Sequence, residues 1–188
     1  MVKIYTKTGD RGQTGTMRGR TGKDEAEVSL LGTIDELNSW LGLIRGQLKA
    51  AGFEKRGRDR YVRNIDGELR RVQGNLMKMS ASVAGSKAKV FKKHETERLE
   101  GLIDRMGGEL PVLKNFIYPT GIGPAGYLQV ARSVCRRVER KLVGFSGGRD
   151  QKSLGLPALA YVNRLSDALF VLARWVNLKM GGDEEVWR

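Results

Sequence analysis

Apolar residues recur at alternating spacings of three and four along most of the chain, the period of an amphipathic α-helix. Four such runs predict helices over residues 29–50, 61–84, 125–145 and 155–180, and a fifth predicts a shorter helix that carries Leu99, Leu102, Ile103 and Met106 and ends at Gly107-Gly108. Three prolines and two glycines, Gly121 and Gly123, between Glu109 and Pro124 predict a loop instead. The pattern therefore predicts an all-α fold, an antiparallel five-helix bundle with shallow left-handed crossings.

The first 28 residues lack this period and are rich in glycine and threonine. We expect an extended N-terminal head over 1–28, in which Val2 and Ile4 indicate a short extended segment, followed by the helical bundle over 29–188. A chain of 188 residues can bury a single core without disulfides, so 1–188 is expected to form one domain. Residues Ser146 to Lys152 are expected to form a turn.

The fourth helical run carries a column of arginines beside its apolar seam. Arg132, Arg136 and Arg140 are four residues apart and share one helix face, and Glu139 lies beside them. Guanidinium groups suit forked contacts to phosphate oxygens, so the column indicates a polyanion bound at the edge of the bundle. A solvated basic face is the alternative. Cys135 falls on the apolar seam and is expected to be a buried hydrophobic residue rather than a nucleophile.

Two further segments could contact a nucleotide. The head contains Thr6-Lys7-Thr8-Gly9, then Thr14-Gly15 and Lys23, a composition that can bring main-chain N–H groups, hydroxyls and positive charge to phosphate oxygens. It does not match the Walker pattern, and an ordinary loop is the alternative. On the fifth run, Asn163 could contact a ribose or base, or could form an interhelical hydrogen bond. Asp35, at the edge of the first seam, could reach a neighbouring chain.

Charge and composition restrict the class of protein. The net charge of +13 favours anionic partners, and part of it lies in the basic clusters Lys55–Arg63 and Lys87–Lys93. A basic helical bundle that binds nucleic acid is therefore a second hypothesis. The two clusters, however, contain few of the aromatic residues on which single-strand binders stack bases. The single Cys135 and single His94 offer no metal site. We see neither a signal-peptide run nor a stretch approaching a membrane span, and expect a cytoplasmic protein without membrane contact.

Six blocks in order along the chain closely resemble ATP:cob(I)alamin adenosyltransferases of the propanediol-utilisation type. They are Ile4–Gly12, Lys23-Asp24, Gly32–Gly42, Phe116–Gly121, Ala131–Arg140 and Tyr161–Phe170. Each block alone is modest, but six collinear blocks span nearly the whole chain. The resemblance implies a specific identity for the polyanion that the arginine column indicates.

The resemblance implies a homotrimer with active sites between subunits. It implies transfer of the 5′-deoxyadenosyl group of ATP, with Mg²⁺, to the cobalt of cob(I)alamin or a corrinoid precursor, giving adenosylcobalamin and triphosphate. A cobalamin reductase and an adenosylcobalamin-dependent acceptor enzyme are the partners it suggests. A nucleotide sensor or corrinoid-delivery protein on the same fold is a third hypothesis.

The resemblance also implies roles for individual residues. Those expected to surround the triphosphate in the head are Thr6, Lys7, Thr8, Gly9, Thr14, Gly15 and Lys23. Those expected to contact the nucleotide from the helices are Arg136, Arg137, Glu139, Arg140 and Asn163. Arg132 is expected to pair with Asp35 of the partner subunit, and Phe116 to press on the lower face of the corrin and displace its axial base.

Overall fold

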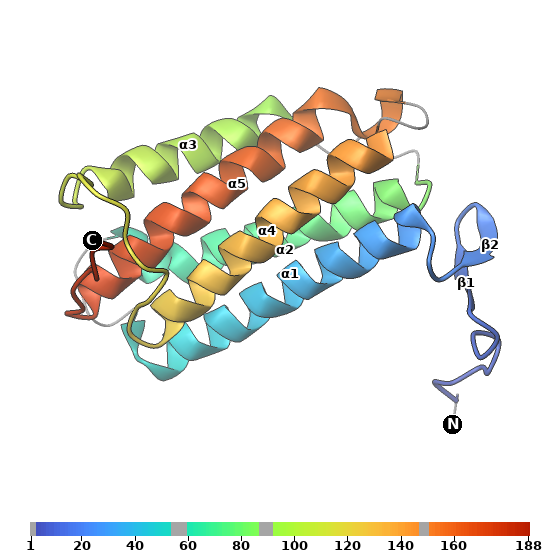
Figure 1. Ribbon diagram of the computed structural model, residues 1–188, viewed down its shortest axis with the longest axis horizontal. Helices are drawn as coiled ribbons and strands as arrows, with labels where there is room; N and C mark the ends of the chain where they lie inside the picture. Colours follow the sequence, from blue (N-terminus) through green and yellow to red (C-terminus); the bar gives the residue numbers. More distant parts are fainter. Residues whose placement is uncertain (1–2, 54–59, 87–91, 147–150) are drawn as a thin grey trace.

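The structure is a computed structural model that describes residues 3–53, 60–86, 92–146 and 151–188, with the backbone alone at 60–63 and 151–155. Over these residues the chain forms five helices and one two-stranded hairpin. The elements are β1 (Gln13–Thr16), β2 (Gly19–Gly22), α1 (Ala26–Ala50), α2 (Arg60–Val83), α3 (Lys93–Gly107), α4 (Pro124–Ser146) and α5 (Gln151–Lys179). Consecutive helices alternate in direction, and the head projects from the end of the bundle where α1 begins (Figure 1).

The helices pack through the seams that the sequence predicts. α5 packs against α3 and α4, and α4 packs against α1. The predicted seam of α1 is fully buried: Leu30, Ile34, Leu37, Leu41, Ile44 and Leu48. On α4 the side chain of Cys135 is also buried, and its thiol donates to the carbonyl oxygen of Val162, 3.4 Å away. The mostly helical five-helix fold is therefore confirmed, and so is the placement of Cys135.

The structure differs from the prediction in three places. The head contains the antiparallel hairpin β1–β2, in which Gln13 lies opposite Gly22 and Thr16 opposite Gly19. Its turn residues, Met17-Arg18, carry no hairpin signature, so the sequence pattern missed it. The helix α1 begins at Ala26, inside the predicted 1–28 head.

The start of α5 is the third difference. The helix begins at Gln151 rather than at residue 155, and Pro157 lies inside it. Ser146, Gln151 and Lys152 were predicted as part of a turn and are helical instead, Ser146 as the last residue of α4. The rest of that predicted turn over 147–150, Val2, and most of the two basic clusters lie outside the described residues.

The fifth helix is more hydrophobic than expected from the sequence pattern. Leu156–Lys179 meets the length and composition expected of a membrane span, contrary to the expectation that no segment approaches one. Half of this window is buried inside the bundle, where Tyr161, Leu165 and Trp175 belong to the core. Its position between α3 and α4 accounts for its hydrophobicity.

A polar network joins α2, α3 and α5. Arg71 donates two hydrogen bonds to the Glu95 carboxylate, at 2.8 and 2.7 Å, and Asn75 donates a third at 3.0 Å. The same Asn75 amide also lies 3.2 Å from the Tyr161 hydroxyl on α5. The hydrogen bonds from Arg71, partly opposed by burial and assisted by Asn75, lower the pKa of Glu95 to about 2 from 4.5.

This network predicts an acid-sensitive contribution to stability. Because the pKa of Glu95 is lower in the folded chain, its stabilisation is complete above pH 4.5 and is lost as the pH falls towards 2. We expect Glu95→Gln to lower the free energy of unfolding at pH 7 by on the order of 2 kcal/mol. The difference from wild type should shrink in urea unfolding at pH 3. Glu97→Gln, at the exposed Lys93 pair, is the control and should show little change. A pH-independent difference would contradict this assignment.

Candidate functional site

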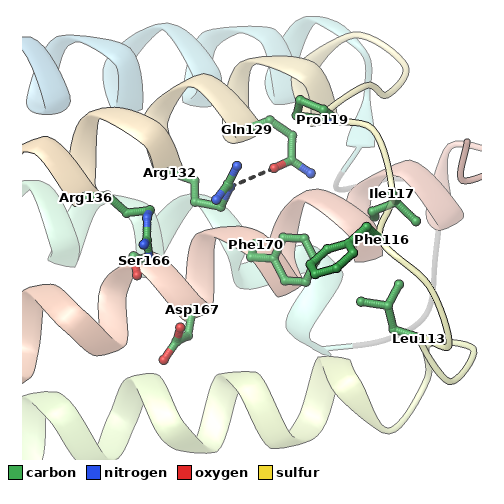
Figure 2. A pocket seen from close by; sticks show the side chains of 10 residues that line it. All are labelled: Leu113, Phe116, Ile117, Pro119, Gln129, Arg132, Arg136, Ser166, Asp167 and Phe170. Carbon is green, nitrogen blue, oxygen red and sulfur yellow. Dashed lines mark hydrogen bonds between the residues drawn. The ribbon is translucent and has the colours of Figure 1, made fainter. Parts of the chain in front are cut away.

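A pocket of about 380 Å³ lies between α4, α5 and the loop that precedes α4. Its lining residues are Leu113, Phe116, Ile117, Pro119, Gln129, Arg132, Arg136, Ser166, Asp167 and Phe170 (Figure 2). The loop and Phe170 supply apolar surface, whereas α4 supplies two guanidinium groups. Three residues that the sequence predicted for one site, Phe116, Arg132 and Arg136, therefore share one pocket.

The two pocket arginines keep their positive charge available. Arg132 donates from Nε to the Gln129 side-chain oxygen at 3.0 Å, and its guanidinium lies 5.9 Å from the centre of the Phe170 ring. Burial, together with the neighbouring charge of Arg136, lowers the pKa of Arg132. Within the described part of the chain, neither arginine forms an ion pair with a carboxylate. Asp167, which lines the same pocket, pairs with Arg164 at 2.8 Å. The arrangement favours binding of an anion between these cations.

The remaining α4 residues make contacts within the bundle. Arg137 forms an ion pair with Glu36 on α1, so that charge is already compensated. Asn163 on α5 donates to the Glu139 carboxylate at 2.9 Å, which is the interhelical hydrogen bond considered as an alternative for this residue. Arg140 is exposed. Asn163 and Glu139 thus form a polar pair adjoining the arginine column, and both remain accessible to a ligand.

The head brings its own predicted residues together. The Thr6 and Thr8 hydroxyls lie 2.8 Å apart, and Arg20 donates to the carbonyl oxygen of Thr8. A Cβ added at Gly9 would lie 3.3 Å from the Lys23 amine, so the glycine permits this close approach. Thr14 and Gly15 follow on β1, where they pair with β2, and Lys7 adopts a positive φ of 60°.

Head and pocket do not meet within one chain. The head projects beyond the end of the bundle where α1 begins (Figure 1), and none of its residues lines the pocket between α4 and α5. Asp35 is exposed on α1 and is not a partner of Arg132 in this chain. The sequence prediction that these groups act on one ligand therefore requires a second copy of the chain.

A segment that the sequence pattern did not predict covers part of the pocket loop. Residues Asp183–Trp187, here called the strap, run along the loop, with Val186 bridged to Ile117. The Trp187 N–H donates to the Phe116 carbonyl oxygen at 2.9 Å, and the two rings lie 6.4 Å apart in an edge-to-face arrangement. Phe116 is 78% and Trp187 56% exposed, so both rings can contact a ligand. The signal available in the sequence was the apolar pair Val186-Trp187 in an otherwise polar segment.

Comparison with known proteins identifies the class to which this bundle and pocket belong. The cobalamin adenosyltransferase family model matches residues 4–176, so the chain belongs to that family. It is 40% identical over 192 residues to a corrinoid adenosyltransferase of Bacillus subtilis, covering 100% of this chain and 93% of that protein. It is 34% identical over 197 residues to the human corrinoid adenosyltransferase MMAB, covering 98% of this chain and 73% of that protein.

Comparison with solved structures shows which type of adenosyltransferase this chain resembles. A variant PduO-type ATP:corrinoid adenosyltransferase from Lactobacillus reuteri, complexed with cobalamin and ATP, superposes with a TM-score of 0.83. The two are 30% identical, and the match covers 99% of each chain. The resemblance to the propanediol-utilisation type is confirmed. Neither these relatives nor these structures support the nucleic-acid-binding alternative.

Proposed function

We propose that this chain transfers the 5′-deoxyadenosyl group of ATP to the cobalt of a reduced corrinoid and releases triphosphate. Corrinoid adenosyltransfer is the activity of its family, and the chain is an enzyme of that class. The observation that carries the proposal is the pocket itself, where two arginines that pair with no carboxylate in the described part of the chain face an apolar wall that includes Phe116. Such a pocket suits a flat macrocycle next to a polyphosphate.

The chemistry needs positioning and charge stabilisation from the protein. The cobalt(I) electron pair forms a bond to C5′ of the ribose while the C5′–O bond breaks and the electrons leave with triphosphate. Arg136 and the Lys23 amine would stabilise the negative charge that grows on the leaving group. No protein nucleophile is required because the reduced metal is the nucleophile. Consistently, burial raises the pKa of the Cys135 thiol, which keeps it protonated.

ATP would enter as its magnesium complex. Among the described residues, no three histidine, cysteine or acidic side chains come together as metal ligands. Mg²⁺ commonly keeps several waters and binds through substrate phosphates with few protein ligands. The phosphate oxygens and bound waters would supply most of its coordination, and the Thr6 and Thr8 hydroxyls would be available to donate to the phosphates or to those waters.

The proposed active unit is a homotrimer with each site formed between two subunits. The head lies away from the pocket of its own chain, which supports donation of Thr6–Gly9 and Lys23 to a neighbour. Arg132 lacks a carboxylate partner within the described residues, and the exposed Asp35 is available to pair with it across the interface. We place the enzyme in the cytoplasm, with a cobalamin reductase that supplies cobalt(I) and an acceptor enzyme that uses adenosylcobalamin.

An anaerobic turnover assay tests the function. The chain is incubated with ATP, Mg²⁺ and chemically reduced cobalamin, and the absorbance of the corrinoid is followed. We expect repeated formation of adenosylcobalamin, together with one triphosphate per turnover. Product no greater than in the enzyme-free control would reject the proposal. A single turnover, with release of product only on addition of ATP, would favour the delivery protein instead.

A further inference from the structure

A buried arginine on α5 connects the strap to the pocket loop. Arg174 is only 8% exposed, and it donates to both carboxylate oxygens of Glu184 on the strap, at 2.5 Å from Nε and 3.1 Å from Nη2. The same Nη2 donates to the carbonyl oxygen of Pro111 in the loop at 2.8 Å. One guanidinium therefore binds two segments that are more than sixty residues apart in sequence, as a fixed fork of donors allows.

One helical turn further along α5, Asn177 makes a second connection. It is 5% exposed, and its Nδ2 donates to the carbonyl oxygen of Asp183 at 2.9 Å, while its Oδ1 accepts from the Ile122 N–H at 2.9 Å. Gly182 lets the chain pass this amide, because an added Cβ would lie 2.3 Å from the Asn177 Oδ1. Arg174 and Asn177 thus fix the loop near both its ends and fix the strap at its start.

The strap and loop pair with each other between these connections. The Tyr118 N–H donates to the Glu185 carbonyl oxygen, and the Trp187 N–H donates to that of Phe116, both at 2.9 Å. This pairing sets the Trp187 ring against the Phe116 ring. The Arg174 guanidinium also lies 5.9 Å from the Phe170 ring, which Arg132 contacts at the same distance. Figure 2 shows Phe116, Phe170 and Arg132 around the same pocket.

Apolar burial holds the strap only weakly. Val186 is 43% exposed and the two aromatic rings are more exposed still, so little hydrophobic surface is removed from water there. Besides the two backbone hydrogen bonds to the loop, the strap is held by the buried, charge-assisted hydrogen bonds of Arg174 and by the amide hydrogen bond of Asn177. A segment fixed mainly by such contacts loses its position when they are removed.

We propose that Arg174 and Asn177 are positioning residues that act through Glu184 and Asp183 to hold Phe116 and Trp187 as one wall of the corrinoid pocket. This inference rests on the proposed function. Neither residue needs to touch the substrate. If the wall displaces the lower axial base, the two residues matter most for a corrinoid that carries such a base, and least for a corrinoid that lacks it.

The test compares cobalamin with cobinamide, a corrinoid that has no lower base. We expect Arg174→Met to lower kcat/KM for cobalamin by about tenfold or more, and that for cobinamide by less than about threefold. The KM for ATP should stay within about twofold of wild type. Arg174→Lys should recover part of the loss because it keeps the charge and one of the hydrogen bonds. Asn177→Asp retains the acceptor for Ile122 and removes the donor to Asp183, so it should give the same selective loss.

Lys179→Met is the matched control. This substitution removes another ion pair between α5 and the start of the loop, that of Lys179 with Glu109 at 2.6 Å. It leaves the hydrogen bonds from Arg174 and Asn177 to the strap in place. It should leave both corrinoids near wild-type rates. Should Arg174→Met fail to fold, Glu184→Gln weakens the same pair from the strap side. An equal loss with cobalamin and cobinamide, or unchanged kinetics, would overturn the positioning role. Failure of the proposed function is distinct, because the wild-type chain would then be inactive with both corrinoids.

Discussion

Replacing Arg136 with methionine is expected to lower kcat for adenosyl transfer by about a hundredfold or more, the usual effect of losing one group that stabilises transition-state charge. The side chain lines the pocket and forms no ion pair within the described residues, so its charge is not consumed by the fold. Because Arg136 is exposed, the folded state should lose little stability. The rate is measured under the anaerobic conditions of the turnover assay, together with a thermal unfolding curve.

Two further variants separate charge from geometry. Arg136→Lys keeps the positive charge but loses the fork, and should recover only part of the rate. Arg70→Met removes an exposed cation from α2, which does not line the pocket, and should leave kcat unchanged. A rate for Arg136→Met close to that for Arg70→Met would remove Arg136 from the site.

Mixing subunits tests whether the head of one chain acts on the pocket of another. Lys23→Met is expected to be inactive because it lacks the head amine, and Arg136→Met because it lacks the pocket guanidinium. In randomly mixed oligomers, about a quarter of the interfaces would combine an intact head with an intact pocket, as cyclic symmetry dictates. Recovery of activity in the mixture would support sites between subunits. Absence of recovery, in mixtures shown to exchange chains, would mean that each head serves its own pocket.

The hydrophobic pattern was sufficient to predict the bundle, and the reason is visible in its core. Residues such as Leu37 on α1 and Val138 on α4 are fully buried at the positions that the three- and four-residue spacing predicts. The hairpin β1–β2 could not be predicted in the same way because its strands, Gln-Thr-Gly-Thr and Gly-Arg-Thr-Gly, contain no apolar side chain that could show an alternating pattern. The early start of α5 was missed because a helix that begins at residue 155 has Pro157 in its first turn, where proline is tolerated, whereas the helix begins at Gln151 with Pro157 inside it.

The candidate site was predictable only where ligand contacts and helix geometry coincide. The four-residue spacing of Arg132 and Arg136 places both on one face whatever the tertiary structure, and both line the pocket. The partner of Arg137 depends on how α1 and α4 pack, so its ion pair with Glu36 could not be found from spacing alone. The strap was missed because Trp187 reaches Phe116 through backbone pairing between segments distant in sequence.

Replacing Phe116 with alanine is expected to spare ATP binding and to lower turnover of cobalamin by about a hundredfold, since a misplaced reacting group can cost that much. The ring is 78% exposed, so its loss removes little buried surface from the folded chain. Cobinamide should be affected far less than cobalamin, because it has no lower base to displace. Val112→Ala, an 83% exposed residue of the same loop that does not line the pocket, is the control. A Phe116→Ala rate equal to that control would reject the proposed contact with the corrin.

The contact between the two rings makes this prediction more specific. Trp187 lies edge-to-face with Phe116, so we expect Trp187→Ala to show the same preference for cobinamide, with a smaller loss. If the rings act as one wall, the double variant should lose little more than Phe116→Ala alone, because residues that act as a unit are not additive. Losses that multiply would instead mean that each ring contacts the corrinoid independently. That outcome would leave Phe116 in the site and remove Trp187 as its support.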